Sequence, residues 1–307
     1  MEFLKLLESI RTPFGDAFFL FVTNGGEEIM LFGVLCLLYW CIDKKLAYRM
    51  AFVYLTSGLA VNTTKLVCRV ERPWVRDPSF TAVEKAKKTA TGYSFPSGHT
   101  QNATALFGTL AYSAKKLWLR ILFFLIIPMV MTSRMYLGVH TPADVCTSFA
   151  ISFVIVLCMN KLADKMTFTH KKRVIVAAGL ILIAISVILY TAYLLANGTI
   201  AIGDASDSFK GYGAGLAFAL CWVLENRYVD FSPSCDALWK QILKVILGMG
   251  VLLLMKELLK HAFPYVFGDS TFGILFANAL RYFILMFWAM LGMPVIIKKY
   301  FQNSKTK

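Results

Sequence analysis

Long apolar runs constrain this chain more than any other feature of its sequence. Hydrophobic residues make up 58% of its 307 residues and charged residues only 16%, against roughly 45–50% and about 25% in an ordinary soluble domain. Several runs approach the ~20 residues that a helix needs to cross a bilayer. A soluble protein would have to hide all of them from water. We therefore predict an all-α, polytopic helical membrane protein.

The positions of the apolar runs predict about nine transmembrane helices. They are residues 27–42, 46–68, 99–115, 117–135, 141–163, 174–196, 210–227, 239–262 and 272–298. Residues 2–22 differ, because Phe3, Leu6 and Ile10 recur at helical spacing but charged residues interrupt them. That pattern predicts an N-terminal interfacial helix.

Three parts follow from this arrangement. We predict an N-terminal interfacial segment over residues 1–26, a catalytic core over 27–165 and a four-helix membrane extension over 166–307. The extension carries few candidate catalytic groups. We expect it to shape a cleft for a lipid or a dimer interface, and the sequence leaves a homo-oligomer open.

The net charge of +14 would point to nucleic acid in a soluble domain. Here the positive residues sit mainly in loops and no nucleic-acid motif accompanies them, so we predict attraction to anionic lipid and no nucleic-acid partner. The side of the C-terminus holds 18 Lys and Arg residues, Lys305 and Lys307 included, and the side of the 69–98 loop holds 12. The positive-inside rule then predicts a cytosolic C-terminus and an extracytoplasmic or luminal 69–98 loop.

Three polar segments interrupt the apolar pattern. They are Lys65–Pro73, Pro96–His99 and Ser133–Asp144. Ionisable residues beside bilayer-spanning segments are costly, so their presence suggests a function. In the predicted topology all three segments lie at the same membrane face, where they can converge. We predict that they build an anion site.

The residue types in these segments indicate phosphate. Lys65, Arg72 and Arg134 supply fixed positive charge, and the arginine fork matches phosphate oxygens. Ser97 and Gly98 precede a helix start, where backbone N–H groups favour anions. These five residues are the predicted phosphate-binding group.

The remaining polar residues indicate catalysis. His140 is a candidate nucleophile on phosphorus, and Asp144, one helical turn further on, would hold its tautomer. His99 would protonate the leaving oxygen and then activate water. The seven cysteines show no metal-ligand spacing and no carboxylate cluster is present, so we predict no metal and no other cofactor.

Together the three segments resemble the signature of the phosphatidic acid phosphatase type 2 superfamily. The similarity consists of Lys-x6-Arg-Pro, Pro-Ser-Gly-His and Ser-Arg-x5-His-x3-Asp, and it covers roughly residues 45–163. It implies the same roles: His140 as nucleophile assisted by Asp144, His99 as acid and base, and a phosphate bound by the five residues above. It also implies a phosphorylated lipid substrate, as in the sphingosine-1-phosphate or undecaprenyl-diphosphate phosphatase branches.

Two alternatives stay open. The protein could be a phosphatase of a soluble phosphate ester, or a non-catalytic lipid-binding or transport protein on the same scaffold. The second alternative is disfavoured because such a protein would be expected to lose a catalytic histidine or a phosphate ligand, and this chain retains all of them. Taken one at a time, Lys65 and Arg134 could also be snorkelling residues at the ends of spans.

Overall fold

The structure, a computed structural model, describes residues 1–302. All regular secondary structure within these residues is helical, which confirms the all-α prediction. Lys305 and Lys307, which entered the charge count, lie outside the described residues, as does the end of the predicted 166–307 extension. The α-helices are α1 (Glu2–Ser9), α2 (Pro13–Thr23), α3 (Glu28–Leu37), α4 (Lys44–Cys68), α5 (Pro73–Arg76), α6 (Glu84–Lys87), α7 (Gly98–Ser113), α8 (Leu117–Tyr136), α9 (Pro142–Lys165), α10 (His170–Ala196), α11 (Ile202–Leu224), α12 (Leu238–Phe267), α13 (Thr271–Phe287) and α14 (Met293–Ile296).

A helix lies at each of the nine predicted span positions. By length and composition, α8, α9, α10 and the helical stretch Thr271–Phe301 could cross a membrane. The stretches Pro13–Gly26 and Glu28–Ile42, bent by 49°, would add a fifth span if they act as one. The described residues thus support four or five spans, and the larger number and the interfacial N-terminal helix stay predictions.

The chain divides into two compact units. The first combines Met1–Phe32 with Arg49–Lys165, and the second combines Gly33–Tyr48 with the chain from Met166 onward. Every residue of the predicted phosphate site belongs to the first unit.

Helix α7 forms the core of the first unit, where it packs against α8 and α9. It is buried along most of its length, because small residues let its neighbours approach. A side chain at Gly108 would come within 3.2 Å of Val156 in α9. The close packing fixes the N-terminus of α7, where the Pro-Ser-Gly-His segment lies.

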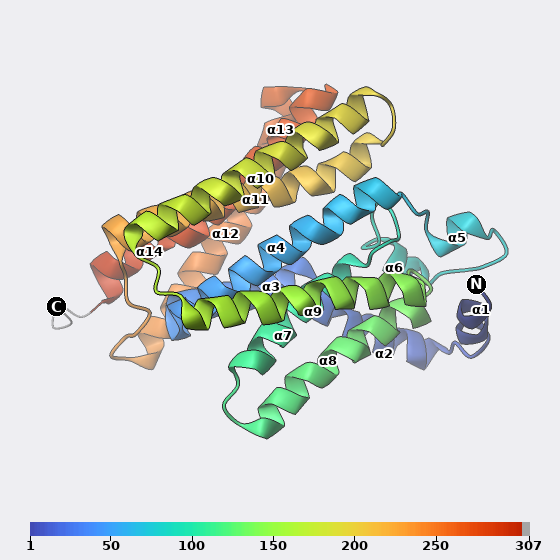
Figure 1. Ribbon diagram of the computed structural model, residues 1–307, viewed down its shortest axis with the longest axis horizontal. Coiled ribbons are helices and arrows are strands. Elements are labelled where there is room, and N and C mark those ends of the chain that lie inside the picture. The colour runs from blue at the N-terminus through green and yellow to red at the C-terminus, as the bar shows by residue number, and fades with distance from the viewer. Residues whose placement is uncertain (303–307) are drawn as a thin grey trace. The chain divides into compact units, whose positions relative to one another are not determined.

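The 69–98 loop is folded onto the end of α8. Val83 N donates to Leu137 O at 3.0 Å, and the small side chains of Ala82, Ala86 and Ala90 pack against Leu137 and its neighbours. Figure 1 shows α5 and α6 at the same end of the first unit as the turn between α8 and α9. This packing brings the three polar segments together.

Helix α1 holds the outer part of the loop. Lys5 Nζ lies 2.8 Å from Asp77 Oδ2, and Glu8 Oε1 accepts from Thr81 N at 2.9 Å. The hydrogen bond from Lys5, together with those from Ser79, lowers the pKa of Asp77 to about 2. The carboxylate therefore stays charged throughout the physiological range.

In the second unit, α11 packs against α10 and α13, and α12 packs against α13 (Figure 1). The contact between α11 and α13 is a backbone approach, because a side chain at Gly213 would lie 2.0 Å from Ala279 O. Only glycine fits there.

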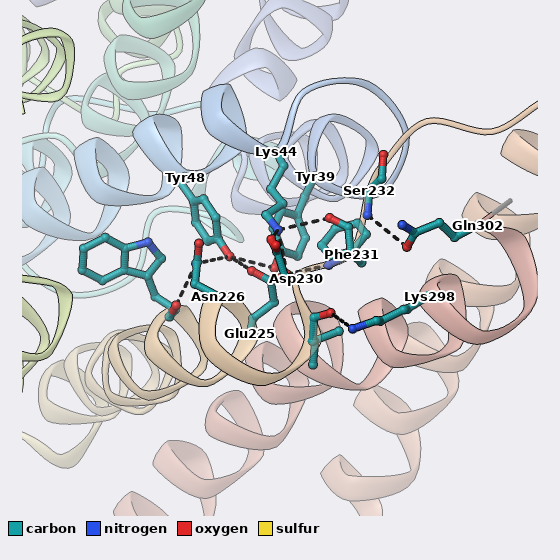
Figure 2. Close-up of polar contacts among 12 residues, drawn as sticks. Tyr39, Lys44, Tyr48, Glu225, Asn226, Asp230, Phe231, Ser232, Lys298 and Gln302 are labelled. Carbon is teal, nitrogen blue, oxygen red and sulfur yellow. Dashed lines mark hydrogen bonds and ion pairs between the residues drawn. The ribbon is translucent and has the colours of Figure 1, made fainter. Parts of the chain in front are cut away.

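A buried polar network lies at the end of α11, in the π-helical turn Glu225–Val229 (Figure 2). The fully buried Glu225 carboxylate accepts from Lys44 Nζ at 2.8 Å and from the hydroxyl of Tyr48. Lys44 Nζ also bonds Asp230 Oδ1 at 3.0 Å and Phe231 O at 3.1 Å. Lys44 is thus an internal counterion of Glu225.

Candidate active site

His140 lies in the turn between α8 and α9 and is fully buried. Its Nδ1 is 3.4 Å from Asp144 Oδ2. That oxygen also accepts from Ser94 Oγ at 2.6 Å and from Thr141 N at 2.8 Å. The hydrogen bonds from Ser94 and Thr141 therefore fix the Asp144 carboxylate, and the carboxylate in turn orients the His140 ring through Nδ1.

The other ring nitrogen of His140 faces Arg72, whose Nη1 lies 2.9 Å from Nε2. A guanidinium can only donate, so Nε2 must carry a lone pair and Nδ1 the proton. Burial, together with the positive charges of Arg72, Arg134 and Lys65, holds the pKa of His140 well below its ordinary 6.5. The imidazole is therefore neutral, and Nε2 is its unprotonated nitrogen.

Arg72 is positioned by backbone carbonyls. Its Nε donates to Gly92 O at 3.0 Å, Nη1 to Val139 O at 3.1 Å and Nη2 to Thr91 O at 2.6 Å. These bonds tie the 69–98 loop to the turn that carries His140. Lys65, in the last turn of α4, donates to Tyr93 O at 3.2 Å and so is fixed to the same loop.

Arg134, in the last turn of α8, has a guanidinium that is fully buried and only partly hydrogen-bonded. Nη1 donates to Thr23 Oγ1 at 2.9 Å, while Nε and Nη2 have no partner among the described residues. Its backbone oxygen accepts from Val139 N at 3.1 Å and His140 N at 3.3 Å. A buried cation with unused hydrogen-bond donors is unfavourable unless an anion accepts those hydrogen bonds and neutralises its charge. The geometry indicates an anion site beside His140.

Ser97 and Gly98 form the start of α7. Ser97 Oγ accepts from Thr100 N at 3.4 Å, and Ser97 N donates to Asp144 O at 3.1 Å. Ser148 Oγ donates to Ser97 O at 2.6 Å, so α9 holds this cap from both sides. A side chain at Gly98 would meet nothing within 4 Å, and the space beside the helix N-terminus is open.

His99 contacts a residue that the sequence analysis did not select. Its Nε2 lies 3.1 Å from Glu27 Oε1. The chain before Glu27 is also part of the site, since Thr23 bonds Arg134. No local pattern in Gly25-Gly26-Glu27 connects it with residue 99.

The structure brings all eight predicted site residues together in the first unit and adds Thr23, Glu27, Ser94 and Thr141. Two histidines each meet a carboxylate, and three cations converge on the same region. Within residues 1–302, no cluster of three or more His, Cys, Asp or Glu side chains has the arrangement to hold a metal ion. The arrangement suits an oxyanion that carries several negative charges.

Comparison with known families defines the class of protein. Residues 46–168 match the PAP2 superfamily, and residues 209–305 match the PAP2 superfamily phosphatase transmembrane extension. The two matches together cover more than half of the chain. The chain belongs to the PAP2 superfamily, the phosphatidic acid phosphatase type 2 group that its motifs resemble.

Individual relatives are more distant. The chain is 24% identical to sphingosine-1-phosphate phosphatase 1 of Rattus norvegicus over 265 residues, which cover 79% of this chain and 59% of the relative. It is 28% identical to phosphatidylglycerophosphatase B of Bacillus subtilis over 136 residues, 41% of this chain and 65% of the relative. The chain thus spans less than two thirds of these relatives. The crystal structure of Aquifex aeolicus LpxE aligns with a TM-score of 0.47 and 24% identity, over 52% of this chain and 93% of that one.

Proposed function

We propose that this protein is an integral membrane phosphatase that hydrolyses a phosphomonoester or diphosphate of a lipid through a phosphohistidine intermediate. The observation that carries the proposal is Arg134, whose buried guanidinium lies beside the turn of His140 and has two nitrogens without a partner in the described part of the chain. A phosphoryl group supplies the missing acceptors and stands within reach of a neutral imidazole.

In the first step, Nε2 of His140 attacks phosphorus. A nitrogen–phosphorus bond forms as the bond from phosphorus to the lipid oxygen breaks, and a proton from His99 converts the leaving oxygen to an alcohol. For a diphosphate the leaving group is the lipid monophosphate. Asp144 holds the Nδ1–H of the ring that becomes positively charged.

In the second step, water attacks the phosphohistidine. His99 takes a proton from the water as its oxygen bonds phosphorus, and the nitrogen–phosphorus bond breaks. Inorganic phosphate leaves and His140 returns to the neutral form. Lys65, Arg72, Arg134 and the N–H groups at the start of α7 stabilise the charge on the phosphoryl oxygens in both steps.

Two observations support a lipid substrate. Four or five helices are apolar and long enough to cross a membrane. A site in such a protein is accessible to substrates that are themselves held in the bilayer. The relatives named above act, by their names, on phosphates of sphingosine and of phosphatidylglycerol. The surplus of Lys and Arg on the side of the C-terminus supports a cytosolic C-terminus and a site on the opposite face.

The test is phosphate release by the purified protein in detergent. The panel is phosphatidate, sphingosine-1-phosphate, undecaprenyl diphosphate and a sugar phosphate, each with and without EDTA. We expect release from at least one lipid, unchanged by EDTA and lost in His140→Ala but not in the loop variant Lys88→Ala. Labelled substrate should leave acid-labile, base-stable phosphate on the protein.

Three results would contradict the proposal. Wild type as inactive as His140→Ala on the whole panel would exclude a phosphatase of these substrates. Release from the sugar phosphate alone would favour the soluble-ester alternative. Lipid binding without release would favour a transport protein.

A further inference from the structure

The site contains a second histidine–carboxylate pair. Nε2 of His99 lies 3.1 Å from Oε1 of Glu27, as Nδ1 of His140 lies 3.4 Å from Oδ2 of Asp144. A carboxylate accepts hydrogen bonds and donates none, so Nε2 of His99 carries a proton. That leaves Nδ1 as the nitrogen that can exchange a proton with a substrate.

The pair is held together by the backbone around it. Asn102 Nδ2, one turn along α7 from His99, donates to Gly26 O at 2.9 Å. A side chain at Gly26 would lie 2.7 Å from His99 O, so the Gly26-Glu27 peptide is seated directly on the first turn of α7. Both side chains are largely shielded, with 11% of His99 and 27% of Glu27 exposed. Glu27 therefore reaches His99 from a fixed position.

Within residues 1–302, Glu27 is also the one negatively charged group with a marked electrostatic effect on His99. The others are the guanidinium of Arg134 from α8 and the ammonium of Lys65 from α4, with the neutral His140 close by. The positive charges of Arg134 and Lys65 disfavour protonation of the His99 imidazole. A general acid must nevertheless be protonated when the bond to the leaving oxygen breaks. A carboxylate in contact with the ring offsets this repulsion.

We propose that Glu27 is the positioning residue of His99: it fixes the ring through Nε2–H and stabilises its protonated form, so that Nδ1 delivers and recovers the catalytic proton. This inference rests on the proposed phosphatase function. Nδ1–H passes to the leaving oxygen as the phosphorus–oxygen bond breaks, and Nδ1 later takes a proton from the attacking water. Nε2–H and the Glu27 carboxylate keep their protonation throughout.

The decisive variant is Glu27→Gln, because the glutamine oxygen can still accept from Nε2–H while the charge is gone. We expect kcat/KM on the best lipid substrate to fall roughly 10- to 100-fold, as for other groups that orient a reacting residue. The basic limb of the kcat/KM profile should move to lower pH, because His99 loses its proton more easily. Glu257→Gln, a change at a carboxylate in α12 that is 59% exposed, should alter neither quantity.

A double-mutant cycle separates action through His99 from general damage to the fold. In a His99→Ala background, Glu27→Gln should cost less than about twofold. The loss should also shrink on p-nitrophenyl phosphate, whose leaving oxygen needs little protonation. An unshifted basic limb, or an equal loss in both backgrounds, would overturn the role of Glu27. If wild type releases no phosphate from the panel, the proposed function fails, and this inference with it.

Discussion

Arg72 Nη1 lies 2.9 Å from Nε2 of His140 and donates a hydrogen bond to its lone pair. The guanidinium thereby selects the tautomer in which Nδ1 carries the proton and faces Asp144. A phosphate oxygen that accepts from Nη1 would release the same lone pair for attack. In the proposed mechanism, binding of the phosphate and activation of the nucleophile would therefore be coupled through one side chain.

Arg72→Lys should lower kcat/KM by about 100-fold or more, the scale of losing one preorganised donor in an active site. The three nitrogens of the arginine donate to three backbone carbonyls and to the imidazole. Lysine keeps the positive charge, but its single nitrogen cannot make all of these hydrogen bonds. Steady-state phosphate release on the best lipid substrate measures the effect, with Arg76→Lys on the exposed end of α5 as the matched control. Activity within about threefold of wild type would show that charge alone suffices.

Arg134→Met should abolish activity without destabilising the protein. The arginine has one hydrogen bond and two buried nitrogens with no partner, so in the absence of an anion its burial is unfavourable. Methionine fills much of the same volume without the charge. We expect phosphate release to fall by at least about 100-fold, while the midpoint of thermal unfolding stays the same or rises.

Inorganic phosphate distinguishes this account of Arg134 from a structural role. Phosphate should raise the unfolding midpoint of wild type, because a ligand that binds only the folded state stabilises it by mass action. It should leave Arg134→Met unchanged. A variant that unfolds several degrees below wild type without phosphate would assign Arg134 to the fold instead.

The local parts of this site could be predicted from the sequence. His140, in the turn before α9, lies only four residues from Asp144 in the first turn of that helix. Ser97 precedes a helix that it then caps. The apolar runs also predicted that the three segments could converge, and the structure brings them together in the first unit. Their placement at one membrane face stays a prediction. Such features depend on short stretches of chain whose spacing is visible in the sequence.

The partners that arrive through tertiary packing could not be predicted. Glu27 is 72 residues from His99, and Thr23 is 111 residues from Arg134. Lys44 and Glu225 are 181 residues apart, and the hydrophobic pattern around each residue does not predict that its side chain is buried. In each case the contact depends on how helices pack, which composition and periodicity do not specify.

His140 should make the stability of the protein depend on pH. Because its pKa in the folded state is well below 6.5, the unfolded chain binds a proton near pH 6.5 that the folded protein does not. The stabilisation is complete above pH 6.5 and is lost as the pH falls below it, by at most about 1.4 kcal/mol per pH unit. Thermal unfolding between pH 7.5 and 5.5 should therefore show a smaller decrease in His140→Asn than in wild type.

The exposed His261 provides the control for this measurement. His261→Asn should follow the wild-type decrease across the same range. Parallel curves for wild type and His140→Asn would contradict the folded-state neutrality of His140, and with it the unprotonated nucleophile.

Removal of one member of the buried network in the second unit should destabilise the protein strongly. In Glu225→Met, the Lys44 ammonium loses its 2.8 Å partner on a side chain that is only 14% exposed, and Phe231 N loses its acceptor. Removal of one partner of a buried ion pair costs roughly 3–5 kcal/mol, and the exposed Asp230 that remains beside Lys44 offsets little of this. Unfolding in mixed micelles with increasing denaturant would measure this loss.

The double variant Lys44→Met/Glu225→Met should be less destabilised than Glu225→Met alone, because it removes both buried charges and leaves apolar groups of similar size. Asp230→Asn provides the control, since that carboxyl contacts the same ammonium at 3.0 Å but is 77% exposed; pairs of this kind contribute about 0–1 kcal/mol. A double variant at least as unstable as Glu225→Met would show that the two side chains stabilise the fold independently. A loss below about 1 kcal/mol in Glu225→Met would show that water reaches Lys44 and that the network contributes little to stability.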